Sequence, residues 1–161
     1  MSLIVRDVCY YELCQGYDYN PGMTIINLAI IDEYPAVRRA LVERLKSSKR
    51  LNVVAAVSNV LEEDTFLPGK NPDVILLELK GRREAGPALV SRLRRALGNQ
   101  KAGIIVLTSY ADDLEQEEAL KAGADRYLLK NIDTENLISE IESVANEVCL
   151  LRGTLKKVTL N

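Results

Sequence analysis

The stretch Asp73-Val74-Ile75-Leu76-Leu77-Glu78-Leu79 decides the fold class of this chain. Apolar residues stand on consecutive positions from Val74 to Leu77, which predicts a strand that is covered on both faces. A second run of this kind, Ile104 to Leu107, follows further along the chain. Strands buried on both faces are typical of parallel sheets with helices packed on either side. The two runs therefore predict the centre of an α/β sheet.

The same alternation of short apolar runs and amphipathic segments extends in both directions from this stretch and forms five strand–helix units. Right-handed crossovers then favour a doubly wound (βα)5 fold, which is a flavodoxin-like three-layer sandwich with parallel strand order 2-1-3-4-5. Its binding crevice would lie at the carboxyl ends of strands one and three. The expected strands are Ile26 to Ile31, Asn52 to Val57, Asp73 to Leu79, Gly103 to Thr108 and Arg126 to Leu129.

The expected helices carry apolar residues at helical spacing between these strands. The first begins at Pro35, because proline suits the first helical turn, and the last is capped by Asp133 or Thr134. The second, over residues 58–66, has the weakest pattern. The apolar stripes are Val37, Leu41 and Leu45 for the first helix; Leu89, Val90, Leu93 and Leu97 for the third; Leu114, Ala119 and Leu120 for the fourth; and Leu137, Ile138, Ile141, Val144, Ala145 and Val148 for the last.

The composition is that of a globular protein, with 47% hydrophobic and 27% charged residues among 161. The net charge of −2 gives no electrostatic drive toward nucleic acid. The chain has no histidine, and Cys9, Cys14 and Cys149 lack metal-ligand spacing, which excludes a Cys/His zinc site. No apolar run approaches the roughly 18 residues that span a bilayer. We therefore expect a cytoplasmic protein with reduced thiols and no membrane contact.

One domain is expected over residues 24–149, because the regular alternation starts just after Met23. Residues 1–23 would be an N-terminal extension of uncertain origin, since Met23 could itself be a start. Residues 150–161 would be a C-terminal tail that is too short for a second domain. No DNA-binding domain is therefore expected in this chain.

Polar side chains follow the strands at the edge of the sheet where such folds bind ligands. Because neighbouring carboxylates raise one another's pKa, the pocket requires a divalent cation or an ammonium group as compensation. An oxygen-only ligand set suits Mg²⁺. Each residue alone also has an ordinary role, such as capping a helix, but their joint placement points to a site. These residues are Asp32 and Glu33 after strand one, Glu78 in strand three, Thr108 in strand four and Lys130 after strand five.

The order and spacing of these residues resemble those of the receiver domains of bacterial two-component response regulators. The resemblance covers about residues 24–146 and implies phosphorelay signal transduction in place of enzymatic turnover. It is carried by Ile30-Ile31-Asp32-Glu33, by Val74-Ile75-Leu76-Leu77-Glu78-Leu79, by Val106-Leu107-Thr108-Ser109 and by residues 122–130, Ala-Gly-Ala-Asp-Arg-Tyr-Leu-Leu-Lys.

The resemblance implies a role for each position in the pocket. Asp32 and Glu33 would hold Mg²⁺ together with the backbone carbonyl of Lys80. Glu78 stands at the phosphoacceptor position. Thr108, Lys130 and Tyr127 would be the switch residues. Thr108 and Lys130 would bind phosphoryl oxygens, and Tyr127 would report whether a phosphoryl group occupies the pocket.

Three departures from the family pattern surround this pocket. The family accepts phosphate on an aspartate, whereas Glu78 extends its carboxylate one methylene further, and a misplacement of ~1 Å can cost about a hundredfold in rate. Gly81-Arg82 replaces a Met-Pro pair. Asn131 replaces a proline, so the Lys130–Asn131 peptide bond is expected to be trans, because a non-proline cis bond costs about 2.5–4 kcal/mol.

These departures favour an atypical receiver, or pseudo-receiver, in which Glu78 mimics a phosphorylated aspartate by reaching Thr108 and Lys130. In a silent version of this reading, Glu78 only pairs with Lys130 in a scaffold. Two alternatives stay open. One is a receiver that accepts phosphate on Glu78 with Mg²⁺, and the other is a flavodoxin-like domain that binds a small ligand, although no glycine-rich phosphate loop follows any strand.

Output is expected through protein–protein interaction, since the chain has no histidine to serve as nucleophile or base. The resemblance implies a histidine kinase or a downstream effector as partner. It also allows a homodimer through the face formed by the fourth helix, the fifth strand and the fifth helix, with Leu114 and Tyr127 on it. Burial in the core would explain most apolar residues of that face equally well.

Overall fold

The computed structural model describes residues 25–58, 71–80, 86–98 and 100–158, with side chains described up to residue 151. All five expected strands are present, whereas the expected second helix lies outside the described residues. The elements are β1 (Ile26–Ile31), α2 (Pro35–Leu45), β2 (Leu51–Val57), β3 (Val74–Leu77), α3 (Gly86–Leu97), β4 (Gly103–Thr108), α4 (Asp113–Lys121), β5 (Arg126–Leu129) and α5 (Thr134–Val158).

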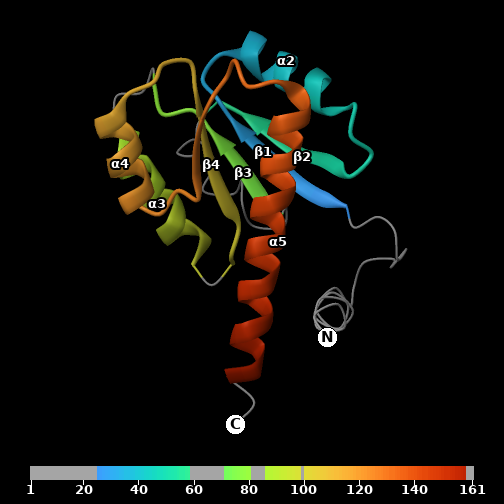
Figure 1. Cartoon of the computed structure of the whole chain (residues 1–161), viewed down its shortest axis with the longest axis vertical. Helices are drawn as coiled ribbons and strands as arrows, with labels where there is room; N and C mark the ends of the chain where they lie inside the picture. Colours follow the sequence, from blue (N-terminus) through green and yellow to red (C-terminus); the bar gives the residue numbers. More distant parts are fainter. Residues whose placement is uncertain (1–24, 59–70, 81–85, 99, 159–161) are drawn as a thin grey trace.

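The five strands form one parallel sheet in the order β2-β1-β3-β4-β5, which confirms the predicted topology (Figure 1). The register aligns a row of residues near the carboxyl ends of four strands. In this row Ile31 pairs with Leu77, Leu77 with Val106, and Val106 with Tyr127. Residues that follow this row therefore share one edge of the sheet.

Helices cover both faces of the sheet because alternate strand residues point to opposite sides. On one face, Ile75 and Leu77 of β3 pack with the apolar residues of α3 and with Ala119 of α4. On the other face, Val74 and Leu76 pack with the apolar stripes of α2 and α5. The result is a three-layer sandwich in which β1, β3 and β4 are buried along their whole length.

The contact between α5 and the sheet is closest at Gly103, the first residue of β4. A Cβ atom added to Gly103 would lie 2.1 Å from Cγ1 of Val144, which is itself fully buried. The valine branch therefore occupies the space that any other residue at position 103 would need. This contact brings the middle of α5 directly onto β4.

Helix α4 differs from its predicted pattern. Ala119 is fully buried as expected, but Leu114 is 66% exposed and Leu120 is 41% exposed. The prediction that these leucines form a buried stripe is therefore wrong. The physical reason is that α4 lies near the edge strand β5 and buries only Ala119.

Helix α5 runs from Thr134 to Val158 and so continues through residues that were expected to form a tail. In Figure 1 this helix crosses the sheet and extends beyond it. Among the side chains described, which end at residue 151, the last buried one of α5 is Val148, and Leu150 and Leu151 are exposed. No helix among the described residues is long and apolar enough to cross a membrane.

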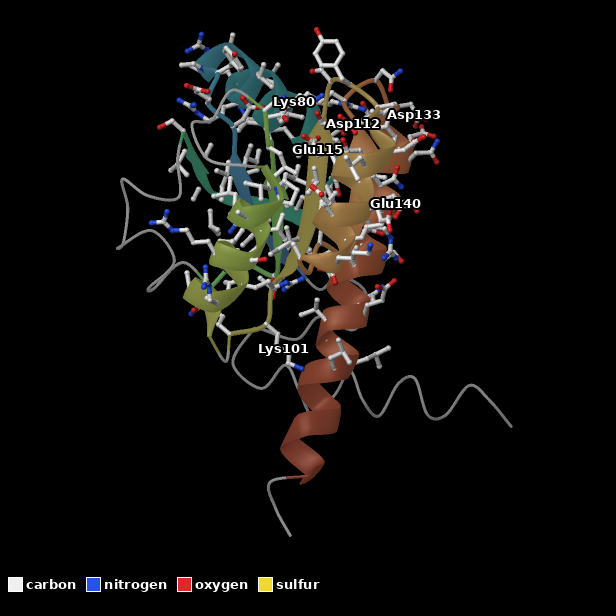
Figure 2. All side chains as sticks on the ribbon, turned by 90° about the vertical axis from the view of Figure 1, so that its left-hand side faces the viewer. Lys80, Lys101, Asp112, Glu115, Asp133 and Glu140 are labelled. Carbon is white, nitrogen blue, oxygen red and sulfur yellow. The ribbon has the colours of Figure 1, made fainter. Side chains whose placement is uncertain are left out.

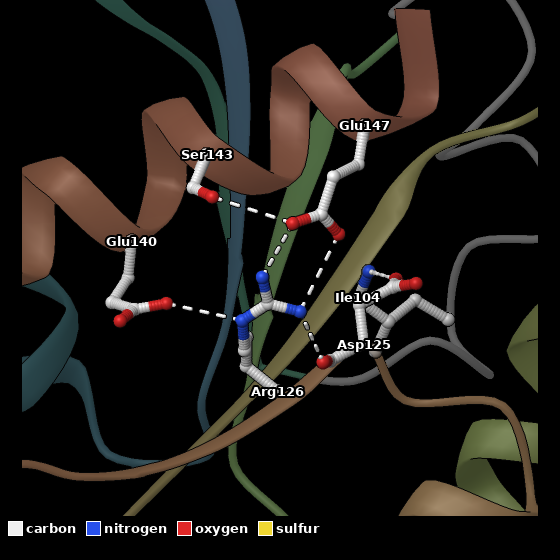
Figure 3. A network of polar contacts seen from close by, with 6 residues as sticks. All are labelled: Ile104, Asp125, Arg126, Glu140, Ser143 and Glu147. Carbon is white, nitrogen blue, oxygen red and sulfur yellow. Dashed lines mark hydrogen bonds and ion pairs between the residues drawn. The ribbon is translucent and has the colours of Figure 1, made fainter. Parts of the chain in front are cut away.

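Two arginines tie the β5 end of the sheet together. Arg94 of α3 donates to the carbonyls of Gly123 (2.8 Å) and Ala102 (2.5 Å) and to Oδ2 of Asp125 (2.6 Å). The second is Arg126 of β5, whose guanidinium lies 3.1 Å from Glu140 and 2.5 Å from Glu147 on α5 (Figure 3). In the same figure, Oδ2 of Asp125 accepts the backbone N–H of Ile104 at 2.7 Å.

Candidate functional site

Backbone hydrogen bonds bring the predicted pocket residues to one edge of the sheet. The N–H of Asp32 donates to the carbonyl of Val57 at 3.0 Å, and that of Glu78 donates to the carbonyl of Ile31 at 2.9 Å. On the other side, Lys130 donates its N–H to the carbonyl of Thr108 at 2.7 Å. The ladder of the sheet thus places Asp32 beside Glu78 and Lys130 beside Thr108.

An ammonium group joins the two acidic strand ends. Nζ of Lys130 lies 2.5 Å from Oδ2 of Asp32 and 2.8 Å from Oε2 of Glu78. Both carboxylates are buried, with Asp32 1% and Glu78 5% exposed. Burial acts to lower the pKa of Lys130, but its hydrogen bonds to Asp32 and Glu78 outweigh burial and raise that pKa above 10.5. Lys130 is therefore held as a cation between the two acids.

The remaining carboxylate oxygens of the pocket accept backbone donors. Oδ1 of Asp32 accepts the N–H of Tyr34 at 2.8 Å, and Oε1 of Glu78 accepts the N–H of Lys80 at 2.9 Å. These turns fix the direction of both side chains. Each of the four carboxylate oxygens of Asp32 and Glu78 therefore has a hydrogen-bond donor, as buried polar groups require.

Thr108 reaches the same edge but is not joined to the acids. Its side chain is fully buried, and its hydroxyl has no hydrogen-bond partner within the described part of the chain. A buried hydroxyl without a partner costs about 1–3 kcal/mol, so its position calls for an explanation, and a binding role at the pocket is one. The expected contact from Glu78 to Thr108 is not made, whereas the contact from Glu78 to Lys130 is.

The residues that the family resemblance implies for Mg²⁺ do not form a ligand cluster here. Residues 25–58, 71–80, 86–98 and 100–158 contain no group of three or more acidic, cysteine or histidine side chains that could hold a metal ion. Glu33 is exposed, and Asp32 is engaged with Lys130 and with the N–H of Tyr34. In this structure the ammonium of Lys130 compensates Asp32 and Glu78, and the Mg²⁺-binding role that the resemblance implies for Asp32, Glu33 and the carbonyl of Lys80 stays a prediction.

Tyr127 is held at the side of the pocket by α4. Its hydroxyl donates to Oε1 of Glu115 at 2.7 Å and lies 3.5 Å from the carbonyl oxygen of Tyr110. Burial, followed by the hydrogen bond to Glu115, raises the pKa of Tyr127 well above 10.0. Glu115 is itself oriented by Asp112, which caps α4 and accepts its N–H at 3.0 Å.

Two further residues around the pocket, Tyr110 and Arg38, were not singled out from the sequence. Nζ of Lys80 lies 5.1 Å from the ring centre of Tyr110, within range of a cation–π contact. Arg38 donates to the carbonyl of Asp32 at 2.6 Å and to that of Glu33 at 3.1 Å. The only sequence signal for Arg38 is its place about one and a half helical turns after the acidic pair, which is too weak to single it out.

The surroundings of the pocket lie at one end of the molecule. Figure 2 shows Lys80, Asp112, Glu115 and Asp133 toward this end, where the strands finish. Lys101, which precedes β4, lies at the opposite end. These charged residues, which follow β3, β4 and β5 in the chain, therefore lie at the same end of the sheet as the strand ends that carry Asp32 and Glu78.

A comparison with family models confirms the receiver-domain resemblance of this fold and pocket. The model of the response regulator receiver domain matches residues 28–142. The chain belongs to this family. Its fold, with strand order 2-1-3-4-5 and the acidic pocket at the carboxyl ends of the strands, is that of a receiver domain of two-component signalling.

Relatives of this receiver domain include longer regulators. It is 27% identical over 135 residues to a nitrate/nitrite response regulator protein homolog of Haemophilus influenzae, covering 84% of this chain and 64% of that protein. It is 28% identical over 120 residues to the DNA-binding transcriptional activator DevR/DosR of Mycobacterium tuberculosis, covering 74% and 54% respectively. The chain thus spans between half and two-thirds of the length of these relatives.

Solved structures show the same fold. The signal receiver domain of the response regulator NarL from Mycobacterium tuberculosis superposes with a TM-score of 0.67. The match covers 76% of this chain and 97% of that one at 20% sequence identity. At this identity the likeness concerns the fold alone.

The relatives correct the partner prediction. We expected a histidine kinase or protein effector, or a homodimer through the α4, β5 and α5 face, with no DNA-binding domain. This expectation, which left DNA out of the partners, is overturned by a relative that is named as a DNA-binding transcriptional activator and of which this receiver domain spans 54%. The receiver sequence did not indicate this, because the match leaves almost half of that relative's length outside the aligned region.

Proposed function

We propose that this chain is an atypical receiver, a pseudo-receiver in which Glu78 takes the place of a phosphorylated aspartate. Its pocket would hold one signalling state without a cycle of phosphorylation at position 78. The observation that carries this proposal is the 2.8 Å contact between Oε2 of Glu78 and Nζ of Lys130. The family resemblance implies that Lys130 binds a phosphoryl oxygen. In this chain a carboxylate oxygen of Glu78 already contacts its ammonium.

The geometry of Glu78 supports the proposal in a second way. Its other oxygen accepts the N–H of Lys80 at 2.9 Å, so both oxygens are held by donors of the pocket. A nucleophile must be free to approach the phosphoryl donor in line, and near-attack placement accounts for much of the rate of such steps. A carboxylate held at both oxygens and 5% exposed is poorly placed to serve as that nucleophile.

Intact-mass analysis tests the first half of the proposal. Wild type, Glu78→Asp and Glu78→Ala are incubated with acetyl phosphate and Mg²⁺, the last as a control for labelling at other carboxylates. We expect only Glu78→Asp to gain the mass of one phosphoryl group. A gain in the wild type that Glu78→Ala lacks would instead show a receiver that accepts phosphate on Glu78.

Spectroscopy separates the mimic from a silent scaffold. The backbone amide signals of Thr108 and Tyr127 are compared by NMR in wild type and in Glu78→Asp before and after phosphorylation. A mimic predicts that wild type matches the phosphorylated Glu78→Asp variant. If wild type matches the unphosphorylated variant, Glu78 is only a partner of Lys130 and the mimic is ruled out.

A further inference from the structure

Arg44, in the last turn of α2, reaches across to the loop that joins β5 to α5. Its Nε donates to the hydroxyl of Thr134 at 2.9 Å, and its Nη1 lies 3.4 Å from the carbonyl oxygen of Lys130. Nη2 donates to the carbonyl of Ile132. One guanidinium therefore contacts three successive parts of a loop that is 86 to 90 residues away in the chain.

The other backbone restraints on this loop within the described residues are local, such as Asp133 accepting the N–H groups of Asn136 (2.9 Å) and Leu137 (3.0 Å). After the backbone hydrogen bond from Lys130 to Thr108, the N–H of Ile132 donates to the carbonyl of Leu129 at 3.0 Å. The Lys130–Asn131 peptide is trans, and Asn131 is exposed. A residue other than proline leaves φ free to vary, so the backbone here needs an external restraint.

A guanidinium is well suited to supply that restraint. Its N–H donors lie in one plane with fixed directions, so it can hold several acceptors in one geometry with little loss of rotamer freedom per bond. Arg44 is half-buried, which strengthens these bonds relative to those of an exposed side chain. The hydrogen bond to Thr134 also anchors the first residue of α5.

The same loop carries the cation of the pocket. The Lys130 side chain is 17% exposed and spans the distance from the strand end to Asp32 and Glu78. A lysine side chain has about 2 kcal/mol of rotamer entropy to lose, so its placement depends on where its backbone is held. Arg44 holds the carbonyl of Lys130 without touching Asp32 or Glu78.

We infer that Arg44 is a positioning residue for this pocket: it holds the loop after β5 so that Nζ of Lys130 lies between Asp32 and Glu78. The inference rests on the proposed function only for the meaning of the pair formed by Lys130 and Glu78. Its geometric content, the placement of Lys130, can be measured whether or not Glu78 mimics a phosphoryl group.

The test measures how fast Lys130 is acetylated by acetic anhydride in the folded protein at pH 8. An Nζ atom that lies between two buried carboxylates, on a side chain that is 17% exposed, is shielded from the reagent and reacts slowly. Peptide mass spectrometry gives the rate relative to Lys121, whose side chain is 71% exposed. In Arg44→Met we expect the relative rate at Lys130 to rise roughly tenfold, the factor that loss of a hydrogen bond to a charged group brings in an equilibrium constant.

Two control variants of α2 separate positioning from general support of the fold. Arg39→Met removes an exposed arginine from the same helix, and Leu45→Ala opens a cavity at a residue that is 1% exposed. Both are expected to leave the Lys130 rate as in wild type, although Leu45→Ala lowers the melting temperature. An unchanged rate in Arg44→Met, or an equal rise in Leu45→Ala, would overturn the inference.

The result stays distinct from the test of the proposed function. Phosphorylation of wild type would refute the proposal that Glu78 mimics a phosphorylated aspartate. The acetylation rate of Lys130 in Arg44→Met would still test the positioning role of Arg44. Conversely, if Lys130 of wild type reacts as fast as Lys121, the positioning inference fails even where only Glu78→Asp accepts phosphate.

Discussion

Nζ of Lys130 lies 2.5 Å from Oδ2 of Asp32, although 98 residues separate the two in the chain. The same ammonium lies 2.8 Å from Glu78, so one cation compensates two buried acids. Removing one member of a buried charge pair leaves an uncompensated charge, which is strongly destabilising. The pocket is therefore also a structural element of the sheet edge, and its variants test both roles.

Lys130→Met is expected to lower the free energy of unfolding by about 3–5 kcal/mol at pH 7, because it leaves two neighbouring carboxylates without a cation. Urea unfolding followed by circular dichroism measures this loss. Lys121→Met, which removes an exposed lysine, is the matched control and should be nearly neutral. A loss below about 1 kcal/mol in Lys130→Met would contradict the buried pairing.

Stability is expected to fall in alkali. The pKa of Lys130 is raised above 10.5 and that of Tyr127 above 10.0, so the folded chain binds more protons than the unfolded chain above about pH 10. The stabilisation is fully present below that pH and is lost as pH rises through the folded-state values. Thermal unfolding between neutral and alkaline pH measures it.

Tyr127→Phe provides the comparison for this alkaline loss. The variant cannot ionise at position 127 and lacks the hydrogen bond to Glu115, so it should be less stable at neutral pH and should lose less on going to alkali. Tyr110→Phe, at a side chain that is 68% exposed, should follow wild type. Parallel curves for wild type and Tyr127→Phe would show that Tyr127 does not contribute.

Gly103→Ala is expected to destabilise the chain by about 1–3 kcal/mol, because the new methyl group would overlap with the buried Val144. The double variant Gly103→Ala/Val144→Ala makes room for that methyl group. The loss of stability in the double variant should therefore be smaller than the sum of the two single losses, which a double-mutant cycle measures. Strict additivity would show that α5 adjusts its position instead.

Arg94→Met is expected to cost about 2 kcal/mol, because it removes charge-assisted hydrogen bonds to two carbonyls and to Asp125. Arg95→Met, at the neighbouring exposed arginine, is the matched control and should be within about 0.5 kcal/mol of wild type. Chemical unfolding compares the two variants. Equal losses would show that Arg94 is not a restraint on the loop before β5.

The sequence by itself determined the fold and the composition of the pocket edge. Apolar residues on consecutive positions at 74–77 and 104–107 favour strands covered on both faces, and right-handed crossovers then favour one common strand order. Because parallel strands share one carboxyl edge, Asp32, Glu78 and Lys130 had to lie near one another. The prediction failed at Leu114 and Leu120, since helical spacing does not tell how much of a helix an edge strand can cover.

Only the tertiary structure decided which of these groups are joined. The contact of Lys130 with both acids, the isolated hydroxyl of Thr108 and the reach of Arg44 to the loop after β5 each depend on side-chain directions over distances of a few ångströms. Sequence spacing carries no such information for residues about 90 positions apart. It was the packing of α2 and α5 on one face of the sheet that brought Arg44 to Lys130.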